Sequence, residues 1–389
     1  MEGLTTDIVQ LLTLAGTPLV AAGLVAVLHG PITRVGLVDT PDHRKLHDGA
    51  IPLAGGPAMA LAFAAMLLAS GAWSVHYQGL LVAMALLCVT GVVDDRHGLS
   101  AGLKFALQIG AALILIYFND LTIDHLGAIT GDGRVALGGW NAPFTVLCVV
   151  GLINAINMLD GLDGLAGGVV AVMLGALALV ALIGGAPAAA IGPGLMLGAL
   201  LGFLAYNFPG VRGKRPRIFM GDSGSMMLGV AVAWFAIDIT FQRGTGIPPM
   251  AIAWILALPV VDTVVIMTRR ILKGRHPMSP DREHLHHIMQ RAGLSQTGTT
   301  WLAMGLTALT GLIGIGAWQL GIDSVWLFAS FLLLIGLNMI VVNHAWRIAR
   351  WIRRLQPRFR QPQNMTKSGT HPASASTGKN CPNDRRREH

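Results

Sequence analysis

Several clusters of polar residues interrupt a largely apolar sequence, and carboxylates are prominent among them. Asp94 and Asp95 form one cluster, in the segment VVDDRHGLSAGLK. Adjacent carboxylates repel one another unless a cation or a shared proton relieves the repulsion. The pair therefore favours a magnesium site or a proton-accepting role, and a solvated helix end is the alternative interpretation.

A second cluster, NAINMLDGLDGL, combines amides with carboxylates. Asn154 and Asn157 are three residues apart, so that helical spacing places them on one face, and Asp160 and Asp163 continue the series. The glycine after each aspartate permits a tight turn with exposed backbone amides, which suits phosphate or metal binding. Helix capping by Asn and Asp is the alternative, but four polar residues at this spacing favour a functional site.

A third cluster is FMGDSGS, which follows Tyr206, Asn207 and a basic loop. Asp222 stands where an apolar helix is expected to begin, and an acidic residue there stabilises the helix dipole. Beside a basic loop, the same carboxylate is also a natural ligand for a metal ion near phosphates. The residues alone leave both interpretations of Asp222 open.

The segment DREHLHH holds three imidazoles within four residues. Zinc would require further well-placed cysteine, histidine or acidic ligands, and no cysteine is near. Contact with phosphate and sugar is therefore favoured, and a surface cluster is the alternative. The residues concerned are Arg282, His284, His286 and His287.

Two other features carry charge in unusual places. Arg44 and Lys45, in DTPDHRKLH, could hold a diphosphate, or could simply anchor a loop at the membrane surface. Asp262 lies within the apolar run LALPVVDTVV. An ionisable group at that depth is a functional candidate by default, although a bond to a neighbouring helix would also account for it.

The elements that position these clusters are expected to be membrane-spanning helices. Of the 389 residues, 53% are hydrophobic and 12% charged, whereas a soluble domain carries about 25% charged residues. Apolar runs of about 20 residues, the length that spans a bilayer, recur along the chain. We therefore expect an all-α, polytopic membrane protein of about eleven transmembrane helices. The expected spans are 7–29, 53–71, 79–93, 101–118, 140–156, 164–184, 189–208, 222–241, 247–268, 299–318 and 323–345.

The distribution of positive charge predicts the orientation of these spans. Basic residues gather on the cytoplasmic side of membrane proteins, and all 28 lysines and arginines except Arg134 and Arg243 fall on one side of the expected topology. The N-terminus is then outside and the C-terminus cytoplasmic. Residues 1–350 form the expected transmembrane domain, and the polar, basic tail 351–389 is expected to be disordered because it cannot bury a core.

The segments VDDR, NAINMLDGLDGL, FMGDSGS and DREHLHH, in this order, resemble the polyprenyl-phosphate N-acetylhexosamine-1-phosphate transferases. The resemblance covers about residues 30–300 and is greatest to the WecA type of this family. The related phospho-MurNAc-pentapeptide transferases share the first three motifs, but their histidine motif differs from the one present here. The combination is specific, although each segment alone is modest evidence.

The resemblance implies a bacterial inner-membrane enzyme that begins a lipid-linked cell-surface polysaccharide. Undecaprenyl phosphate would attack the phosphorus that bears the sugar of a UDP-N-acetylhexosamine, with GlcNAc as the first expectation, and UMP would leave. Mg²⁺ is the expected cofactor, with Mn²⁺ as an alternative ion. Another UDP-amino-sugar donor stays open, as do a homodimer and a covalent phospho-enzyme. A transporter is disfavoured, because transporters place polar residues near the midplane.

The resemblance also implies roles for individual residues. Asp94 and Asp95 match an acidic pair proposed to handle the lipid phosphate or the metal, and Asp163 and Asp222 match magnesium ligands. One position departs from the family, since a further acidic residue often stands where this chain has Gly98. The expected substrate-binding residues are Arg44, Lys45, Lys104, Asn154, Asn157, Asp160, Asn207, Arg282, His284, His286 and His287.

Overall fold

The computed structural model describes residues 2–39, 49–209, 216–275 and 284–344. Helices dominate these residues, and the two strands form one short antiparallel pair. The first half contains α1 (Glu2–Arg34), β1 (Val38–Asp39), β2 (Ile51–Pro52), α2 (Gly55–Ala69), α3 (Gln78–His97), α4 (Ala101–Asn119) and α5 (Asn141–Leu159), with the 3₁₀ turns η1 (Val75–Tyr77) and η2 (Gly138–Trp140). The second half contains α6 (Leu165–Ile183), α7 (Pro187–Asn207), α8 (Gly221–Phe241), α9 (Pro249–Ile255), α10 (Ala257–Leu272), α11 (Leu285–Arg291), α12 (Gln296–Gln319) and α13 (Ser324–Asn343).

The prediction of an all-α protein with many membrane spans is confirmed, and each expected span is helical. Among the described residues, nine helices are long and apolar enough to cross a membrane, or ten if a bent pair counts as one span. The expected span 53–71 becomes α2, which has only 15 residues. At 1.5 Å per residue α2 is about 22 Å long, shorter than the roughly 30 Å hydrocarbon core.

The expected span 247–268 is broken into two helices. α9 and α10 meet at an angle of 84°. Pro259 lies in the first turn of α10 and has no N–H with which to bond the carbonyl of Ile255, four residues earlier. Because proline is tolerated in the first turn of a helix but interrupts a continuous one, α10 begins in a new direction.

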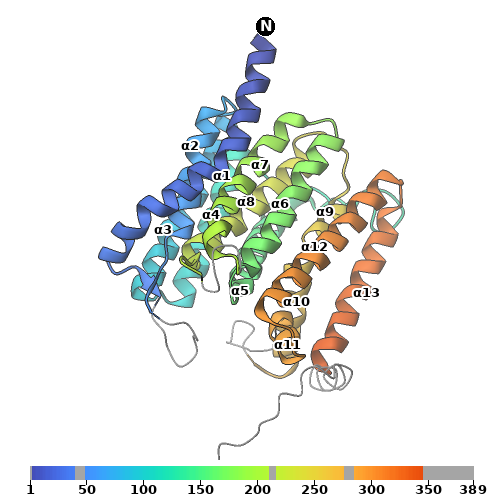
Figure 1. Cartoon of the computed structure of the whole chain (residues 1–389). Helices are drawn as coiled ribbons and strands as arrows, with labels where there is room; N and C mark the ends of the chain where they lie inside the picture. Colours follow the sequence, from blue (N-terminus) through green and yellow to red (C-terminus); the bar gives the residue numbers. More distant parts are fainter. Residues whose placement is uncertain (1, 40–48, 210–215, 276–283, 345–389) are drawn as a thin grey trace, which may run out of the picture.

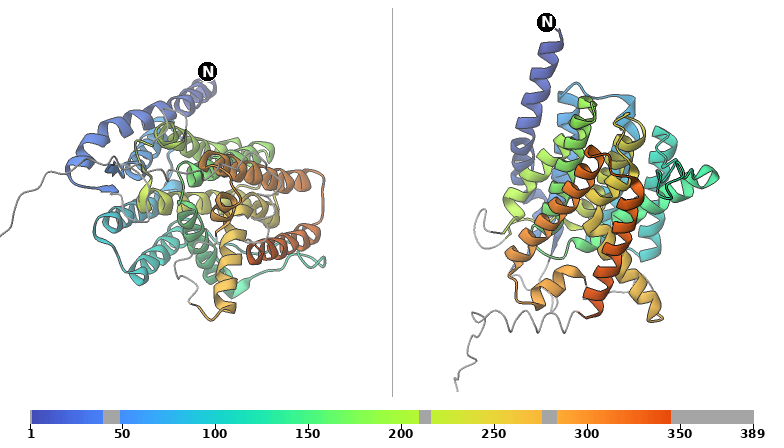
Figure 2. Two further views of the ribbon diagram at one scale, coloured as in Figure 1. Left: turned by 60° about the horizontal axis from the view of Figure 1, so that its bottom comes forward. Right: turned by 90° about the vertical axis from the view of Figure 1, so that its right-hand side faces the viewer.

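α8 is the central helix of the bundle, as Figures 1 and 2 show. It packs against α3 and α5. Of its most apolar 18 residues 89% are buried, compared with 17% for the peripheral α13. Gly91 of α3 allows a very close approach, because an added Cβ there would collide with the backbone of Asp222 and Ser223. The acidic end of α3 is therefore held directly against the beginning of α8.

The short strand pair fixes the segment that leads into α8. Val38 is paired with Pro52 across the two strands. The N–H of Phe219 then donates to the carbonyl of Pro52 at 3.0 Å, and the N–H of Gly55 donates to the carbonyl of Phe219 at 3.1 Å. These bonds join the beginning of α2 to the beginning of α8.

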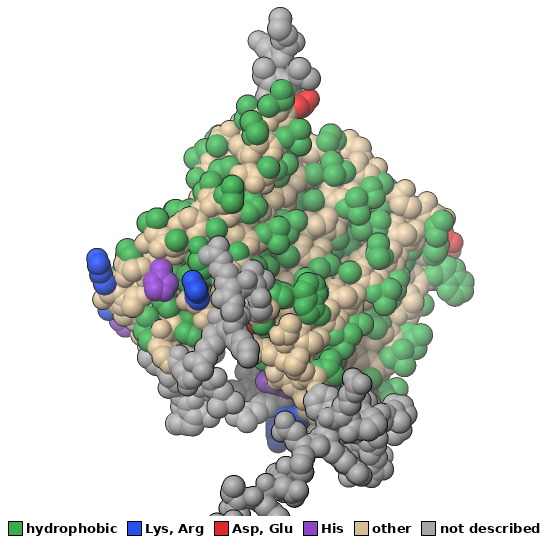
Figure 3. All heavy atoms as spheres, viewed as in Figure 1, with side chains coloured by type: hydrophobic (Ala, Val, Ile, Leu, Met, Phe, Trp, Pro, Cys, Tyr) green, Lys and Arg blue, Asp and Glu red, His purple; other side chains and the backbone are tan. Residues whose placement is uncertain are grey.

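The outer surface of the bundle fits a multi-pass membrane protein. Figure 3 shows hydrophobic side chains over most of the visible face, whereas the visible Lys, Arg and His side chains lie in its lower half. Large apolar residues such as Leu19, Leu312 and Leu333 are more than half exposed. In a bilayer these side chains would contact lipid tails rather than water.

Candidate active site

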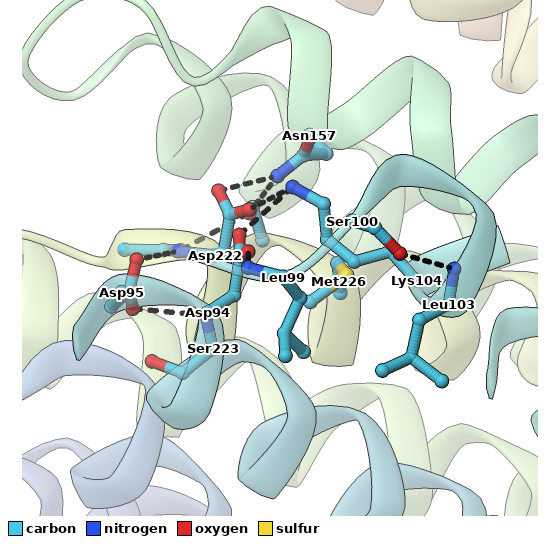
Figure 4. A network of polar contacts seen from close by, with 12 residues as sticks. Asp94, Asp95, Leu99, Ser100, Leu103, Lys104, Asn157, Asp222, Ser223 and Met226 are labelled. Atoms are coloured by element: carbon cyan, nitrogen blue, oxygen red, sulfur yellow. Dashed lines mark hydrogen bonds and ion pairs between the residues drawn. The ribbon is translucent and has the colours of Figure 1, made fainter. Parts of the chain in front are cut away.

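Three charged side chains from three helices meet at the beginning of α8. The Lys104 Nζ of α4 lies 2.8 Å from Asp94 Oδ2 of α3 and 3.4 Å from Asp222 Oδ2 of α8. Figure 4 shows the ammonium group between the two carboxylates. The three side chains are partly buried, with 29%, 11% and 29% of their surface exposed for Lys104, Asp94 and Asp222.

Asp95 points away from this group and has different partners. The backbone N–H groups of Asp222 and Ser223 donate to its Oδ1 and Oδ2 at 3.1 and 3.5 Å. Gly221 makes room for the carboxylate, because its φ is +68° and an added Cβ would lie 2.5 Å from Asp95 Oδ2. The repulsion expected between two adjacent acids is thus relieved by a lysine for Asp94 and by the free N–H groups of a helix end for Asp95.

Asn157 completes the surroundings of Asp222. Its Nδ2 donates to Asp222 Oδ1 and to Ser225 Oγ, both at 2.9 Å. One carboxylate oxygen of Asp222 therefore faces an amide and the other faces the Lys104 ammonium. Ser225 belongs to the FMGDSGS motif but had no role assigned from the sequence. It lies three residues after Asp222 and so on the same face of α8.

A second polar pair lies one helical turn behind Lys104 and Asn157. Asn154 Nδ2 donates to Gln108 Oε1 at 2.6 Å and to the carbonyl of Val150 at 2.8 Å. Gln108 is buried, and its Nε2 lies 3.5 Å from the sulfur of Met226. Sequence reasoning missed Gln108 as well, although its spacing of four residues from Lys104 in an apolar helix was a usable signal.

The turn after α5 carries Asp160 and Asp163. Asp160 is exposed at the surface but surrounded by much of the protein. Its pKa is raised to about 7, mainly by desolvation and to a smaller extent by repulsion from Asp222, Asp95 and Asp163. Asp163 is half-buried, and its backbone carbonyl accepts a bond from Thr300 Oγ1 at 3.4 Å. This turn therefore adds two carboxylates to the negative charge near α8.

Asn207 is buried and holds two segments together. Its Oδ1 accepts the N–H of Gly164 at 2.8 Å, and its Nδ2 donates to the carbonyl of Ile218 at 2.9 Å. The first bond fixes the end of the Asp163 turn, and the second fixes the approach to α8. A direct contact of Asn207 with a nucleotide stays a prediction.

The histidine motif lies beside the same turn. The rings of His284 and His286 are stacked 5.8 Å apart, and the His286 and His287 rings are 4.2 Å apart. An added Cβ on Gly161 would lie 3.0 Å from His286 Nε2. Burial, followed by the charges of His287 and His284, lowers the pKa of His286 to about 3, so this ring is neutral.

Some predicted residues fall elsewhere. Arg44, Lys45 and Arg282 lie outside the described residues, so their roles stay predictions. Gly98 ends α3 with φ +68°, and its N–H donates to the carbonyl of Asp94 at 2.8 Å. Because a side chain at this left-handed position would be strained, the local geometry suits glycine rather than the acid common in the family.

The donor set at Asp94 and Asp222 fits magnesium better than zinc. Within the described ranges, no group of three or more His, Cys, Asp or Glu residues is arranged to hold a metal ion. Mg²⁺ usually needs only one or two carboxylates, together with water and substrate phosphates. Two facing carboxylates beside a lysine satisfy that requirement, whereas the third and fourth protein ligands of a zinc site are lacking among these residues.

Several known proteins with similar sequences carry the same name. The pattern of glycosyl transferase family 4 matches residues 77–240, which include Asp94, Lys104, Asn157 and Asp222. The undecaprenyl-phosphate alpha-N-acetylglucosaminyl 1-phosphate transferase of Salmonella typhi is 34% identical over 86% of this chain and 92% of its own length. The enzymes of that name from Escherichia coli K12 (33% identical, 86% and 92% covered) and Haemophilus influenzae (34%, 84% and 92%) are similar. The chain therefore belongs to the glycosyl transferase family 4 proteins that include these transferases.

Proposed function

We propose that this protein transfers N-acetylglucosamine 1-phosphate from UDP-N-acetylglucosamine to undecaprenyl phosphate and releases UMP. The observation that carries the proposal is the network of Lys104, Asp94 and Asp222 at the start of the most buried helix. The relatives named for this transfer, which cover most of the chain, support the acceptor and the sugar phosphate.

Phosphoryl transfer depends on positioning and charge neutralisation more than on covalent chemistry by the protein. Lys104 supplies a fixed positive charge, and the bonds from Asn157 and Lys104 hold both oxygens of Asp222 in place. Asp94 is bonded to Lys104 and to the N–H of Leu99, at 2.7 Å, and we propose that it handles the lipid phosphate or the metal.

Asp94 and Asp222 would hold a Mg²⁺ ion, with Asp163 as the further ligand that the family resemblance implies. Bound there, Mg²⁺ (or Mn²⁺) would neutralise charge on the donor diphosphate. The histidine motif lies against Gly161, next to Asp160, and we propose that sugar and phosphate groups of the donor are bound there.

We further propose that the site faces the cytoplasm of a bacterial inner membrane, with the N-terminus outside. The positive-inside rule supports this orientation, since Arg96, Lys104 and Arg217 all flank the ends of α3, α4 and α8 that carry the site. The acceptor lipid would then reach the site sideways from the bilayer.

The orientation can be tested with thiol labelling of intact cells. A variant with Cys88→Ala and Cys148→Ala keeps Cys381 as a reporter in the tail, and Asp132→Cys adds one in the exposed loop between α4 and α5. We expect an impermeant maleimide to label Asp132→Cys in intact cells and Cys381 only after permeabilisation. The reverse pattern would overturn the orientation.

A panel of UDP-sugars tests the donor. Purified protein, Mg²⁺ and undecaprenyl phosphate are incubated with UDP-GlcNAc, UDP-GalNAc, UDP-glucose and a UDP-deoxy-N-acetylhexosamine, and UMP is measured. We expect the highest kcat/KM with UDP-GlcNAc. Preference for another UDP-amino-sugar would replace GlcNAc with that sugar and leave the reaction class unchanged. Loss of UMP release on chelation, with recovery on adding Mg²⁺, is expected as well.

A further inference from the structure

Asp262 is a buried carboxylate whose two oxygens are both bonded to the histidine motif. It is 4% exposed, in the second turn of α10. Its Oδ2 lies 2.8 Å from His284 Nδ1, and its Oδ1 accepts the N–H of Leu285 at 3.0 Å. An ionisable group in an apolar helix is costly unless it is paired, and these two bonds provide the pairing.

The bend between α9 and α10 is what places this carboxylate. Because α10 departs from α9 at 84°, its second turn does not continue along the axis of α9, and it lies against the start of α11. A small cavity between α5, α10 and α11 is lined by Leu159, Asp262 and His286. Asp262 thus lies between the helix that carries the Asn154–Asp160 cluster and the helix that carries the histidines.

The bond also determines the proton arrangement of His284. We assign the proton of this bond to Nδ1 of His284, because a carboxylate oxygen accepts hydrogen bonds. The tautomer and the ring orientation of a histidine are set by the partner of one nitrogen, which decides what the other nitrogen offers. Nε2 of His284 is then the nitrogen that remains for another group.

His284 contacts the rest of the site through its ring, which packs on the ring of His286. Its ring is stacked on that of His286 with an interplanar angle of 9°. His286 is 3% exposed and lies against Gly161, next to Asp160. A change at Asp262 would therefore alter the contact between the histidine motif and the turn after α5.

We propose that Asp262 is a positioning residue that acts through His284 to hold the histidine motif in place for the sugar-phosphate part of the donor. The inference rests on the proposed transfer from a UDP-sugar. The bonds of Asp262 go to His284 and Leu285 in the histidine motif, whereas those of Asp94 go to Lys104 and Leu99. We therefore expect a change at Asp262 to affect the donor more than the lipid acceptor.

The test compares the KM values of both substrates in Asp262→Ala and Asp262→Asn. Loss of a hydrogen bond to a charged group costs about ten-fold or more in affinity, so we expect KM for UDP-GlcNAc to rise about ten-fold in Asp262→Ala. KM for undecaprenyl phosphate should stay within two-fold of the wild type. Asp262→Asn keeps the shape and one acceptor oxygen, and we expect a smaller rise.

A matched control removes a similar pair elsewhere. Asp238 is 2% exposed and lies near the opposite end of α8 from Asp222. Its Oδ1 lies 2.7 Å from His76 Nε2, and its Oδ2 lies 2.8 Å from Arg243 Nε. We expect Asp238→Ala and Asp262→Ala both to lower the melting temperature in detergent, and Asp238→Ala to leave both KM values unchanged. This control distinguishes general loss of stability from loss of positioning.

A double-variant cycle tests whether Asp262 acts through His284. Residues that act through one another show non-additive effects, so Asp262→Ala should raise the donor KM no further in a His284→Ala background. Additive effects of the two substitutions, or equal changes in the KM values of donor and acceptor, would overturn the inference about Asp262. The proposed function would still be supported if the wild-type protein turns over. An inactive wild type would overturn the proposed function and, with it, the donor role of Asp262.

Discussion

Asp95 and Asp222 are joined across the interface of α3 and α8, because the backbone N–H of Asp222 donates to Asp95 Oδ1 at 3.1 Å. Asp95 therefore acts as a helix cap supplied by another helix. The N–H groups at a helix start have no partner within the helix, and this contact satisfies two of them. The neighbouring Asp94 is left to face Lys104.

Asp95→Ala and Asp95→Asn are expected to differ in stability. Loss of a capping side chain costs about 1 kcal/mol, and Asn caps nearly as well as Asp. We expect Asp95→Ala to unfold at a temperature several degrees below the wild type in detergent, and Asp95→Asn to retain most of the wild-type stability. Equal melting temperatures for Asp95→Ala and the wild type would show that the cap is dispensable.

Lys104 is expected to be needed for turnover more than for folding. Its removal leaves the carboxylates of Asp94 and Asp222 facing one another without a cation. Loss of one preorganised charge partner of a reacting group costs roughly 10²–10³ in kcat, and we expect a loss of that size for Lys104→Met. Lys104→Arg keeps the charge and should retain more activity. Identical kcat values for the two variants would argue against a role for the charge.

Gln108 and Asn154 are expected to stabilise the contact between α4 and α5. Gln108→Leu leaves the Nδ2 of Asn154 with only the carbonyl of Val150. Hydrogen bonds between membrane helices contribute about 0.6 kcal/mol on average, so we expect a small fall in the melting temperature.

The double variant Gln108→Leu/Asn154→Leu separates packing from substrate binding. Removing both partners of a buried bond is often less harmful than removing one, so stability should recover in part. If activity recovers too, Asn154 serves to pack α4 against α5. If stability recovers and KM for the donor stays high, Asn154 contacts the substrate, as the family resemblance implies.

The raised pKa of Asp160 leads us to expect that stability depends on pH in the absence of metal. Its pKa is raised to about 7 in the folded protein, above the value of about 3.9 for an unperturbed Asp. The stability that this group contributes is present below about pH 3.9 and is lost as the pH rises through 7. We expect Asp160→Asn to flatten this part of a plot of melting temperature against pH, whereas Asp132→Asn, in the exposed loop after α4, should not. A profile unchanged by Asp160→Asn would contradict the raised pKa.

The lowered pKa of His286 leads us to expect the opposite dependence of stability on pH. Its pKa is lowered to about 3 in the folded protein, compared with about 6.5 for an unperturbed histidine. The stability it contributes is therefore complete above pH 6.5 and is lost as the pH falls toward 3. His286→Gln should weaken this acid sensitivity in thermal unfolding measured from pH 4 to 7. A wild-type melting temperature that is constant over that range would rule out the neutral, buried state.

The fold could be predicted from the sequence because the length of an apolar run measures directly whether a helix can cross a membrane. The break before α10 also had a signal in Pro259, but a proline alone does not reveal the 84° change of direction. The expected span was longer than α2 because it also included Leu53 and Ala54 before the helix and Ser70 and Gly71 after it.

The sequence predicted which residue types form the site better than it predicted which residues contact one another. Adjacent residues on a helix point in different directions, so that Asp94 and Asp95 have separate partners, and those partners depend on where α4 and α8 pack. Gln108 and Ser225 were missed because neutral polar residues are inconspicuous beside charged ones. Asp262 was identified by its charge, and its partner His284 lies 22 residues further along the chain.

Transfer of the labelled β-phosphate tests the central claim most directly. UDP-GlcNAc with ³²P in the phosphate attached to the sugar is incubated with Mg²⁺, undecaprenyl phosphate and the purified protein, and the lipid and water phases are counted separately. We expect the label to enter the lipid phase with one UMP released per lipid product, and Asp222→Asn, although folded, to give neither. Release of labelled UDP, or no transfer from any UDP-N-acetylhexosamine, would contradict a sugar-1-phosphate transferase.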